Sequence, residues 1–189
     1  MRTLRTLADA VAMDDAGSER DRPGRQRVVH LVNRLAASAG ARTDDALRPV
    51  LGTAGELLAR HRDHVPQAAE LLVRAVDPDA GPDALYDALD RLARLHEGRP
   101  VLAARTAGVL GARLGAPHGE NDGGTLLALV ARLAEDGGTA HGHMAVELAA
   151  TAGPRTGWSG PWRTQLRLLR RHPDADVRDA AYAEVTVRE

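Results

Sequence analysis

The residues of this chain that could do chemistry are few, and the closest pair is His141-Gly-His143. Side chains two positions apart point to different sides of a helix, so these histidines could share a metal only in a non-helical segment. His143 and Glu147, four residues apart, could share a metal on a helix. The alternative interpretation is a capping turn followed by a polar surface pair, and we favour it.

Other reactive patterns are incomplete. His118, Glu120 and Asp122 stand in a glycine-rich stretch that is typical of a solvated turn. His96-Glu97 lacks the second histidine of a zinc-protease motif, and no serine stands in a Gly-x-Ser-x-Gly elbow. The chain has no cysteine and no lysine, so it lacks a thiolate nucleophile and the lysine of a phosphate-binding loop. We therefore expect no enzymatic activity, no cofactor and no metal.

Candidate binding residues come from arginine and tryptophan. The expected helix near the C-terminus carries a basic stripe formed by Arg163, Arg167, Arg170 and Arg171. This stripe could bind phosphates or an acidic partner, and the alternative is a solvated charged surface. Trp158 and Trp162 flank a short turn, and either an exposed anchor or a filler of the seam between helix pairs would suit an indole. Further candidates on the second helices of expected pairs are Arg74, Arg105 and Arg178.

Composition predicts the elements that must position these side chains. Aromatic residues make up only 2% of the chain, Phe is absent, and leucine, alanine and valine dominate the apolar residues. Because alanine and leucine favour helices, we expect an all-α protein. The formal net charge is -1, which lacks the global footprint of a nucleic-acid binder. No apolar run reaches the roughly 18 residues that span a membrane, so we expect no membrane association and a cytoplasmic location.

Helical patterns repeat along the chain. The first helices of successive pairs start near 43, 82, 124 and 161, at intervals of about 39, 42 and 37 residues, which is the period of two-helix repeats. We expect one repeat domain over residues 1–189. Its first, divergent pair spans 1–40 with a polar loop at 14–24, and later pairs span 43–78, 81–115, 123–153 and 160–187.

The clearest unit is the last one, where Trp162, Leu166 and Leu169 share one helix face and Pro173 ends that helix. Asp174 then suits the N-cap of a second helix. The segment His172-Pro-Asp-Ala-Asp-Val-Arg-Asp-Ala-Ala181 resembles the second-helix motif of HEAT repeats, and Val65-Pro-Gln-Ala-Ala69 is a partial echo. The resemblance implies a right-handed α-solenoid of about five antiparallel helix pairs, with a scaffold or binding role and no catalytic residue.

These observations favour a non-enzymatic module that binds another protein. The alternative is a nucleic-acid-binding protein that resembles the HEAT-like DNA-repair glycosylases, for which the arginine stripe and the two tryptophans speak. An accessory subunit related to phycobilin lyases and a terminal piece of a longer repeat array stay open as further alternatives, because fold alone does not decide function.

Overall fold

The computed structural model describes residues 22–38, 46–115, 123–184 and 186, and this part of the chain is helical throughout, with no strand. The all-α prediction is confirmed. None of the described helices is long and apolar enough to cross a membrane. The contacts group the chain into two compact units, Met1–Val76 and Asp77–Glu189, and each is described by itself. That residues 1–189 form one repeat domain stays a prediction.

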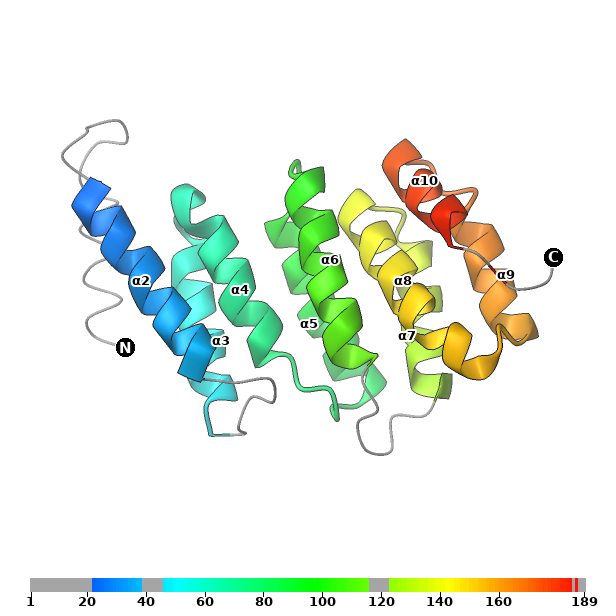
Figure 1. Cartoon of the computed structure of the whole chain (residues 1–189), viewed down its shortest axis with the longest axis horizontal. Helices are drawn as coiled ribbons and strands as arrows, with labels where there is room; N and C mark the ends of the chain where they lie inside the picture. The colour runs from blue at the N-terminus through cyan, green and yellow to red at the C-terminus, as the bar shows by residue number, and fades with distance from the viewer. Residues whose placement is uncertain (1–21, 39–45, 116–122, 185, 187–189) are drawn as a thin grey trace. The chain divides into compact units, whose positions relative to one another are not determined.

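The first unit contains α2 (Arg22–Ser38), α3 (Arg48–Ala59), a 3-10 turn η2 (Arg62–His64) and α4 (Val65–Ala75). Figure 1 shows α3 and α4 running back on one another, and α2 packs against α4. Leu51, Ala54 and Leu58 of α3 are buried, as are Ala68 and Leu71 of α4. With several buried valines, the core of this unit consists of the leucine, alanine and valine that dominate the apolar part of the composition.

Two helix starts in this unit differ from expectation, and proline explains both. Helix α2 begins at Arg22, inside the expected polar loop 14–24, with Pro23 in its first turn. Helix α3 begins at Arg48 and not near 43, with Pro49 in its first turn. A proline lacks the N–H that a helix interior needs, so the first turn is where it fits best. Residues 1–21 of the first expected pair and the expected helix start near 43 lie outside the described residues.

The second unit contains three pairs of helices. They are α5 (Pro82–Leu95) with α6 (Pro100–Leu114), α7 (Gly123–Glu135) with α8 (Thr139–Ala152), and α9 (Gly160–Leu169) with α10 (Ala175–Ala183). A 3-10 turn, η3 (Pro154–Thr156), follows α8. The expected helix start near 82 is confirmed, and so is Asp174 as the N-cap of α10; Pro100 begins α6.

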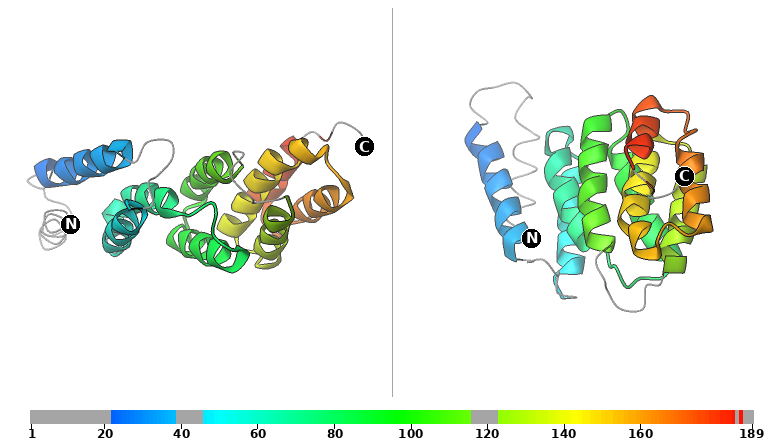
Figure 2. Two further views of the ribbon diagram at one scale, coloured as in Figure 1. Left: turned by 90° about the horizontal axis from the view of Figure 1, so that it is seen from below. Right: turned by 45° about the vertical axis from the view of Figure 1, so that its right-hand side comes forward.

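Helix α8 is the centre of the second unit, since it packs against α6, α7, α9 and α10. The left view of Figure 2 shows α5, α7 and α9 in one layer and α6 and α8 in the other. Residues on every side of α8 are buried, including Met144, Ala145, Leu148 and Ala149. A helix buried all round needs no polar face, which explains why α8 lacks the clear amphipathic pattern of α5. The N-terminal end of α8, at Thr139, lies near the connections between α5 and α6 and between α9 and α10.

Candidate functional site

A pocket of about 480 Å³ opens at one end of the second unit, where the turns of its three helix pairs meet. The α5–α6 turn supplies one wall, the start of α8 the middle, and the start of α10 the opposite wall. The side chains that matter for its chemistry are Arg94, His96, Glu97, Arg99, His141, Asp174 and Asp176. This volume is in the range of small-ligand sites. The pocket is the candidate functional site of this unit.

His96 stands in the α5–α6 turn and is buried with no hydrogen-bond partner. Its side chain is 1% exposed, and neither ring nitrogen bonds to any described residue. Gly98 takes the left-handed conformation (φ 69°) that closes the turn, and the Arg99 N–H then donates to the His96 carbonyl at 2.8 Å. Burial, helped by the charge of Arg99, lowers the pKa of His96 to about 4. The ring is therefore a neutral imidazole in the pocket wall, with one donor and one acceptor unused.

The α9–α10 turn, by contrast, bonds one ring nitrogen of its buried histidine, although the His172 Nε2 atom has no partner among the described residues. The Nδ1 atom of His172 accepts the Asp174 N–H at 3.1 Å. The Asp174 carboxylate accepts the N–H groups of Asp176 and Val177, which caps α10. Arg178 donates to the carbonyls of His172 and Pro173, both at 2.8 Å. This wall of the pocket is a rigid, internally bonded turn.

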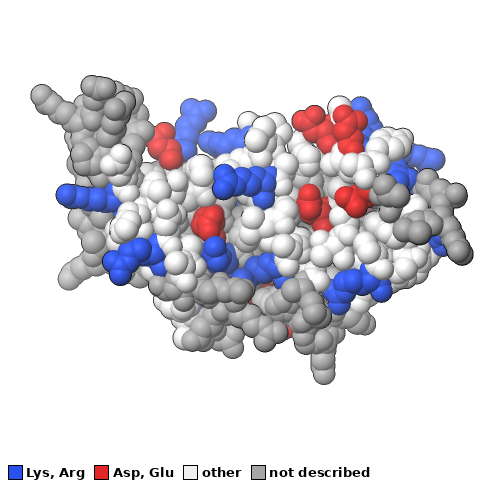
Figure 3. Space-filling view, in the orientation of Figure 1, with Lys and Arg blue, Asp and Glu red and all other residues white. Residues whose placement is uncertain are grey.

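Asp174 also joins this turn to the start of α8. The Thr139 hydroxyl donates to Asp174 Oδ2 at 2.6 Å, and this bond, with the two capping N–H groups, lowers the pKa of Asp174. The neighbouring Asp176 carboxylate is exposed and has no hydrogen bond or ion pair with any described residue. In Figure 3 the negative side chains gather near the start of α10. One wall of the pocket is therefore anionic, with one engaged and one unengaged carboxylate.

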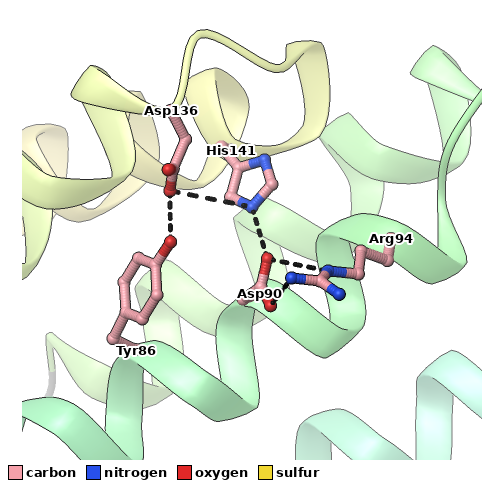
Figure 4. Close-up of polar contacts among 5 residues, drawn as sticks. All are labelled: Tyr86, Asp90, Arg94, Asp136 and His141. Atoms are coloured by element: carbon pink, nitrogen blue, oxygen red, sulfur yellow. Dashed lines mark hydrogen bonds and ion pairs between the residues drawn. The ribbon is translucent and has the colours of Figure 1, made fainter.

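On the side of the pocket opposite the α9–α10 turn, a polar network connects α5 to α8 (Figure 4). The Nε2 atom of His141 lies 3.2 Å from Asp90 Oδ1 and 4.0 Å from Asp136 Oδ2. Arg94 pairs with Asp90 at 2.8 Å, and the Tyr86 hydroxyl donates to Asp136 at 2.5 Å. This last bond raises the pKa of Tyr86. The network connects α5 to the α7–α8 turn, and it positions Arg94 and His141 at the pocket.

The charges of this network are balanced at Asp90. Burial of Asp90 opposes its ionisation, but the hydrogen bonds from His141 and Arg94 and the positive charge of Arg94 outweigh that effect, so the pKa of Asp90 is lowered. Arg94 is therefore neutralised by its own helix. It adds less positive charge to the pocket than its position suggests.

The arginine stripe predicted from the sequence does not act as a unit. Arg170 donates to the carbonyls of Ala181 and Glu184 beyond the end of α9, so it ties α9 to α10. Arg178 holds the α9–α10 turn, as described above. Arg163 is half-buried, and Arg167 and Arg171 are exposed. Arg170 and Arg178 therefore tie backbone segments of this unit together through their guanidinium groups.

Two further candidates lie in different units. Arg74 of α4 forms an ion pair with Glu70 at 2.9 Å within the first unit. Arg105 of α6 is exposed in the second unit.

The two tryptophans are not exposed anchors, and this corrects their assignment as binding residues. Trp158 and Trp162 are both buried. Trp158 follows Gly157 in the left-handed region (φ 52°), and its indole lies against Gly153, where a Cβ atom would come within 2.5 Å of the ring. The large indole area is better covered by the helices around α8 than left in water. These residues stabilise the second unit from within and are not available at its surface.

The metal candidates do not assemble among the described residues. Helix α8 includes His141 and His143 and turns them to different sides, as expected for residues two apart: His141 bonds to Asp90, whereas His143 is buried. Burial lowers the pKa of His143. No group of three or more histidine and carboxylate side chains within the described ranges could hold a metal. His118, Glu120 and Asp122 lie outside them.

Sequence reasoning missed the pocket, although a weak signal was present. Buried histidines stand in the turn before the second helix of three pairs, namely His64, His96 and His172. A histidine that recurs before each expected second helix could have been noticed in the sequence. No family model matches this chain, and comparisons with curated proteins and with solved structures find no match. The site must therefore be interpreted from its own geometry.

Proposed function

We propose that this chain is a non-enzymatic protein–protein interaction module, built as a HEAT-like right-handed α-solenoid of antiparallel helix pairs. The two-layer packing of α5 to α9 around α8 supports this architecture within the second unit. Each such pair leaves one apolar face that its neighbour must cover, which is the principle of repeat proteins. We expect the module to act by presenting a surface to a partner.

A strip of exposed residues on α6 carries the proposal. Val101, Arg105 and Val109 stand at i, i+4 and i+8, so they share one side of the helix. The two valines are 84% and 53% exposed. Single exposed apolar residues are ordinary, but a row of them beside a pocket marks a surface for a partner. We call these three residues the α6 strip.

The α6 strip and the pocket adjoin. The strip begins in the first turn of α6, where Pro100 also lines the pocket. We propose that a segment of a partner protein lies along the strip, with one end at the pocket. The apolar side chains would supply affinity and the polar pocket would supply specificity.

The test compares two variants with similar exposure. Val109 on the α6 strip and Leu168 on α9 are 53% and 51% exposed. The tagged full chain, Val109→Gln and Leu168→Gln are used to capture partners from native lysate, with and without nuclease, and the captured proteins are quantified by mass spectrometry. We expect a protein that survives nuclease, is retained by Leu168→Gln, and is captured roughly tenfold less by Val109→Gln.

Two results would contradict the proposal. Equal capture by both variants would show that the α6 strip takes no part. Capture that disappears with nuclease would favour the nucleic-acid alternative, since exposed arginines such as Arg167 and Arg171 could then contact phosphates.

A further inference from the structure

We infer that the pocket binds a positively charged side chain, lysine or arginine, of the partner segment, between the Asp176 carboxylate and the unpartnered ring of His96. The source of that side chain rests on the proposed function, whereas the preference of the pocket for a cation does not. Three observations carry the inference: the charge of the walls, the unused acceptor of His96, and the size of the pocket.

The first observation is the balance of charge. Glu97, Asp174 and Asp176 line the pocket as carboxylates, against the guanidinium groups of Arg94 and Arg99. Arg94 is paired with Asp90, which lies directly behind it. Asp136 adds a further carboxylate 4.0 Å from the His141 ring. The acidic groups therefore outnumber the basic ones, and a cation entering the pocket gains from this field.

Two features of the pocket favour an anion, and their effect is weaker than that of the acidic side chains. Helix α8 has no side-chain cap at Gly138, so its first N–H groups and the positive end of its dipole face the pocket. A helix terminus is equivalent to roughly half a positive charge, and Asp174 already lies beside it through its bond to Thr139. Arg99 donates to the Leu95 carbonyl at 3.3 Å, which holds its guanidinium against α5. The charge of Arg99 does reach the His96 ring, because it helps to lower the pKa of His96, so the cation is held chiefly by the unengaged carboxylate of Asp176.

The second observation is His96. A buried polar group without a partner is costly, so such groups mark places where a partner arrives from outside the chain. Because its pKa lies near 4, the ring stays neutral at physiological pH and keeps an acceptor lone pair. An ammonium or guanidinium group offers only donors. One donor can bond to this nitrogen once the covered ring turns toward the pocket, and another can bond to a carboxylate of the pocket wall.

The third observation is size. A pocket of about 480 Å³ holds a long side chain together with the backbone that carries it. The methylene stem of lysine or arginine suits the apolar part of the wall, which includes Ala93, Pro100 and Ala103. The charged end would then reach the carboxylates.

The experiment uses the full chain and a pair of isosteric probes. N-acetyl-arginine amide carries a guanidinium, and N-acetyl-citrulline amide has the same shape without the charge. Each is titrated to about 10 mM into the isotopically labelled protein, and backbone amide shifts are followed by nuclear magnetic resonance, because a single side chain binds in the millimolar range. We expect saturable shifts at Gly98, Thr139, Ala140 and Asp176 with the arginine probe and at least a fivefold weaker response with citrulline.

Variants decide whether the pocket is responsible. Asp176→Asn and His96→Leu should each weaken binding of the arginine probe by about tenfold or more, whereas Asp179→Asn removes an exposed carboxylate of the same helix outside the pocket and should leave it unchanged. Equal responses to both probes, equal effects of Asp176→Asn and Asp179→Asn, or no shifts at the pocket would overturn the inference. Pocket shifts caused by N-acetyl-glutamate amide in preference to arginine would overturn it in favour of an anion site.

The two proposals fail separately. If the arginine probe binds the pocket but Val109→Gln captures the same proteins as wild type, the cation site stands and the α6 strip does not. If capture depends on Val109 but the pocket ignores the arginine probe, the interaction module stands and the cation site does not.

Discussion

The α5–α6 turn and the α9–α10 turn differ in one respect that matters for function. Each holds a buried histidine ahead of its second helix, His96 in one and His172 in the other. His172 accepts the Asp174 N–H, and Asp174 then caps α10. The ring of His96 bonds to no described residue, and α6 starts without a side-chain cap at Arg99. The α9–α10 turn therefore bonds one of its two histidine nitrogens and caps its second helix, whereas the α5–α6 turn leaves both histidine nitrogens without a partner and its second helix without a side-chain cap.

This difference identifies the turn whose polar groups do not contribute to the stability of the second unit. A hydrogen-bonded turn stabilises the fold, while an unsatisfied imidazole destabilises it. Residues that cost stability and line a pocket are typical of binding sites, since sites often trade stability for function. In the proposed cation site, the α5–α6 turn is the side of the pocket with unused hydrogen-bonding capacity, and the α9–α10 turn forms the opposite wall.

The largest expected effect is on acid stability. The unfolded chain protonates His96 near its ordinary pKa of 6.5, whereas the native chain does so only near 4. The unfolded state therefore binds more protons between these values, and the native state loses stability as the pH falls through this window, by up to about 3 kcal/mol. His96→Leu should remove this part of the pH dependence in urea unfolding measured from about pH 7 to about pH 4.

The pKa values of His143 and His172 are also lowered, and this adds an acid sensitivity that wild type and His96→Leu share. It therefore cancels in the comparison of wild type with His96→Leu. An unchanged slope of unfolding free energy against pH would show that His96 is not held neutral.

The next effect is the loss of the α10 cap. Asp174→Ala removes two capping bonds and the bond from Thr139, and we expect a loss of about 2 kcal/mol in the free energy of unfolding. Asp176→Ala, two residues along, has no such bonds and should change stability by less than about 0.5 kcal/mol. Similar losses for both variants, measured by urea unfolding at neutral pH, would remove Asp174 as the special residue of this turn.

The two histidines should respond with opposite signs at neutral pH. His96→Leu replaces an unsatisfied imidazole with an apolar side chain and should stabilise the protein by about 1 kcal/mol. His172→Leu removes the acceptor of the Asp174 N–H together with the unpartnered Nε2 atom. Because the lost bond also positions the Asp174 cap of α10, we expect a net loss of about 1 kcal/mol. Thermal unfolding of both variants beside wild type measures the signs directly. Equal signs would erase the contrast between the two turns.

The smallest effect separates two arginines of the predicted stripe. Arg170→Ala breaks bonds to the Ala181 and Glu184 carbonyls and should cost about 1 kcal/mol. Arg167→Ala removes an exposed side chain and should stay within about 0.5 kcal/mol. Urea unfolding of the two variants side by side resolves this difference, and equal costs would return Arg170 to the surface stripe.

The sequence by itself determined the helical class and much of the second unit's layout. Absence of Phe and Ile and abundance of leucine and alanine leave helices as the only well-supported elements. Local signals also located several ends, because proline and a capping aspartate act within one turn of the chain. Helix α5 starts at Pro82, near the predicted position, and Asp174 caps α10 as predicted. Where a proline was not weighed, as at Pro49, the predicted helix start was wrong.

Only the tertiary structure decided the site. The pocket gathers residues from turns near 96, 139 and 174, and no local pattern measures how closely three turns approach one another. Burial is likewise a property of the packed unit: it hides Trp158 and Trp162, which the sequence left as possible anchors, and it holds His96 neutral. Periodicity can place a side chain on one face of a helix, but what covers that face depends on distant segments. Contacts between distant segments therefore determine which polar groups have hydrogen-bond partners and which remain unsatisfied in the pocket.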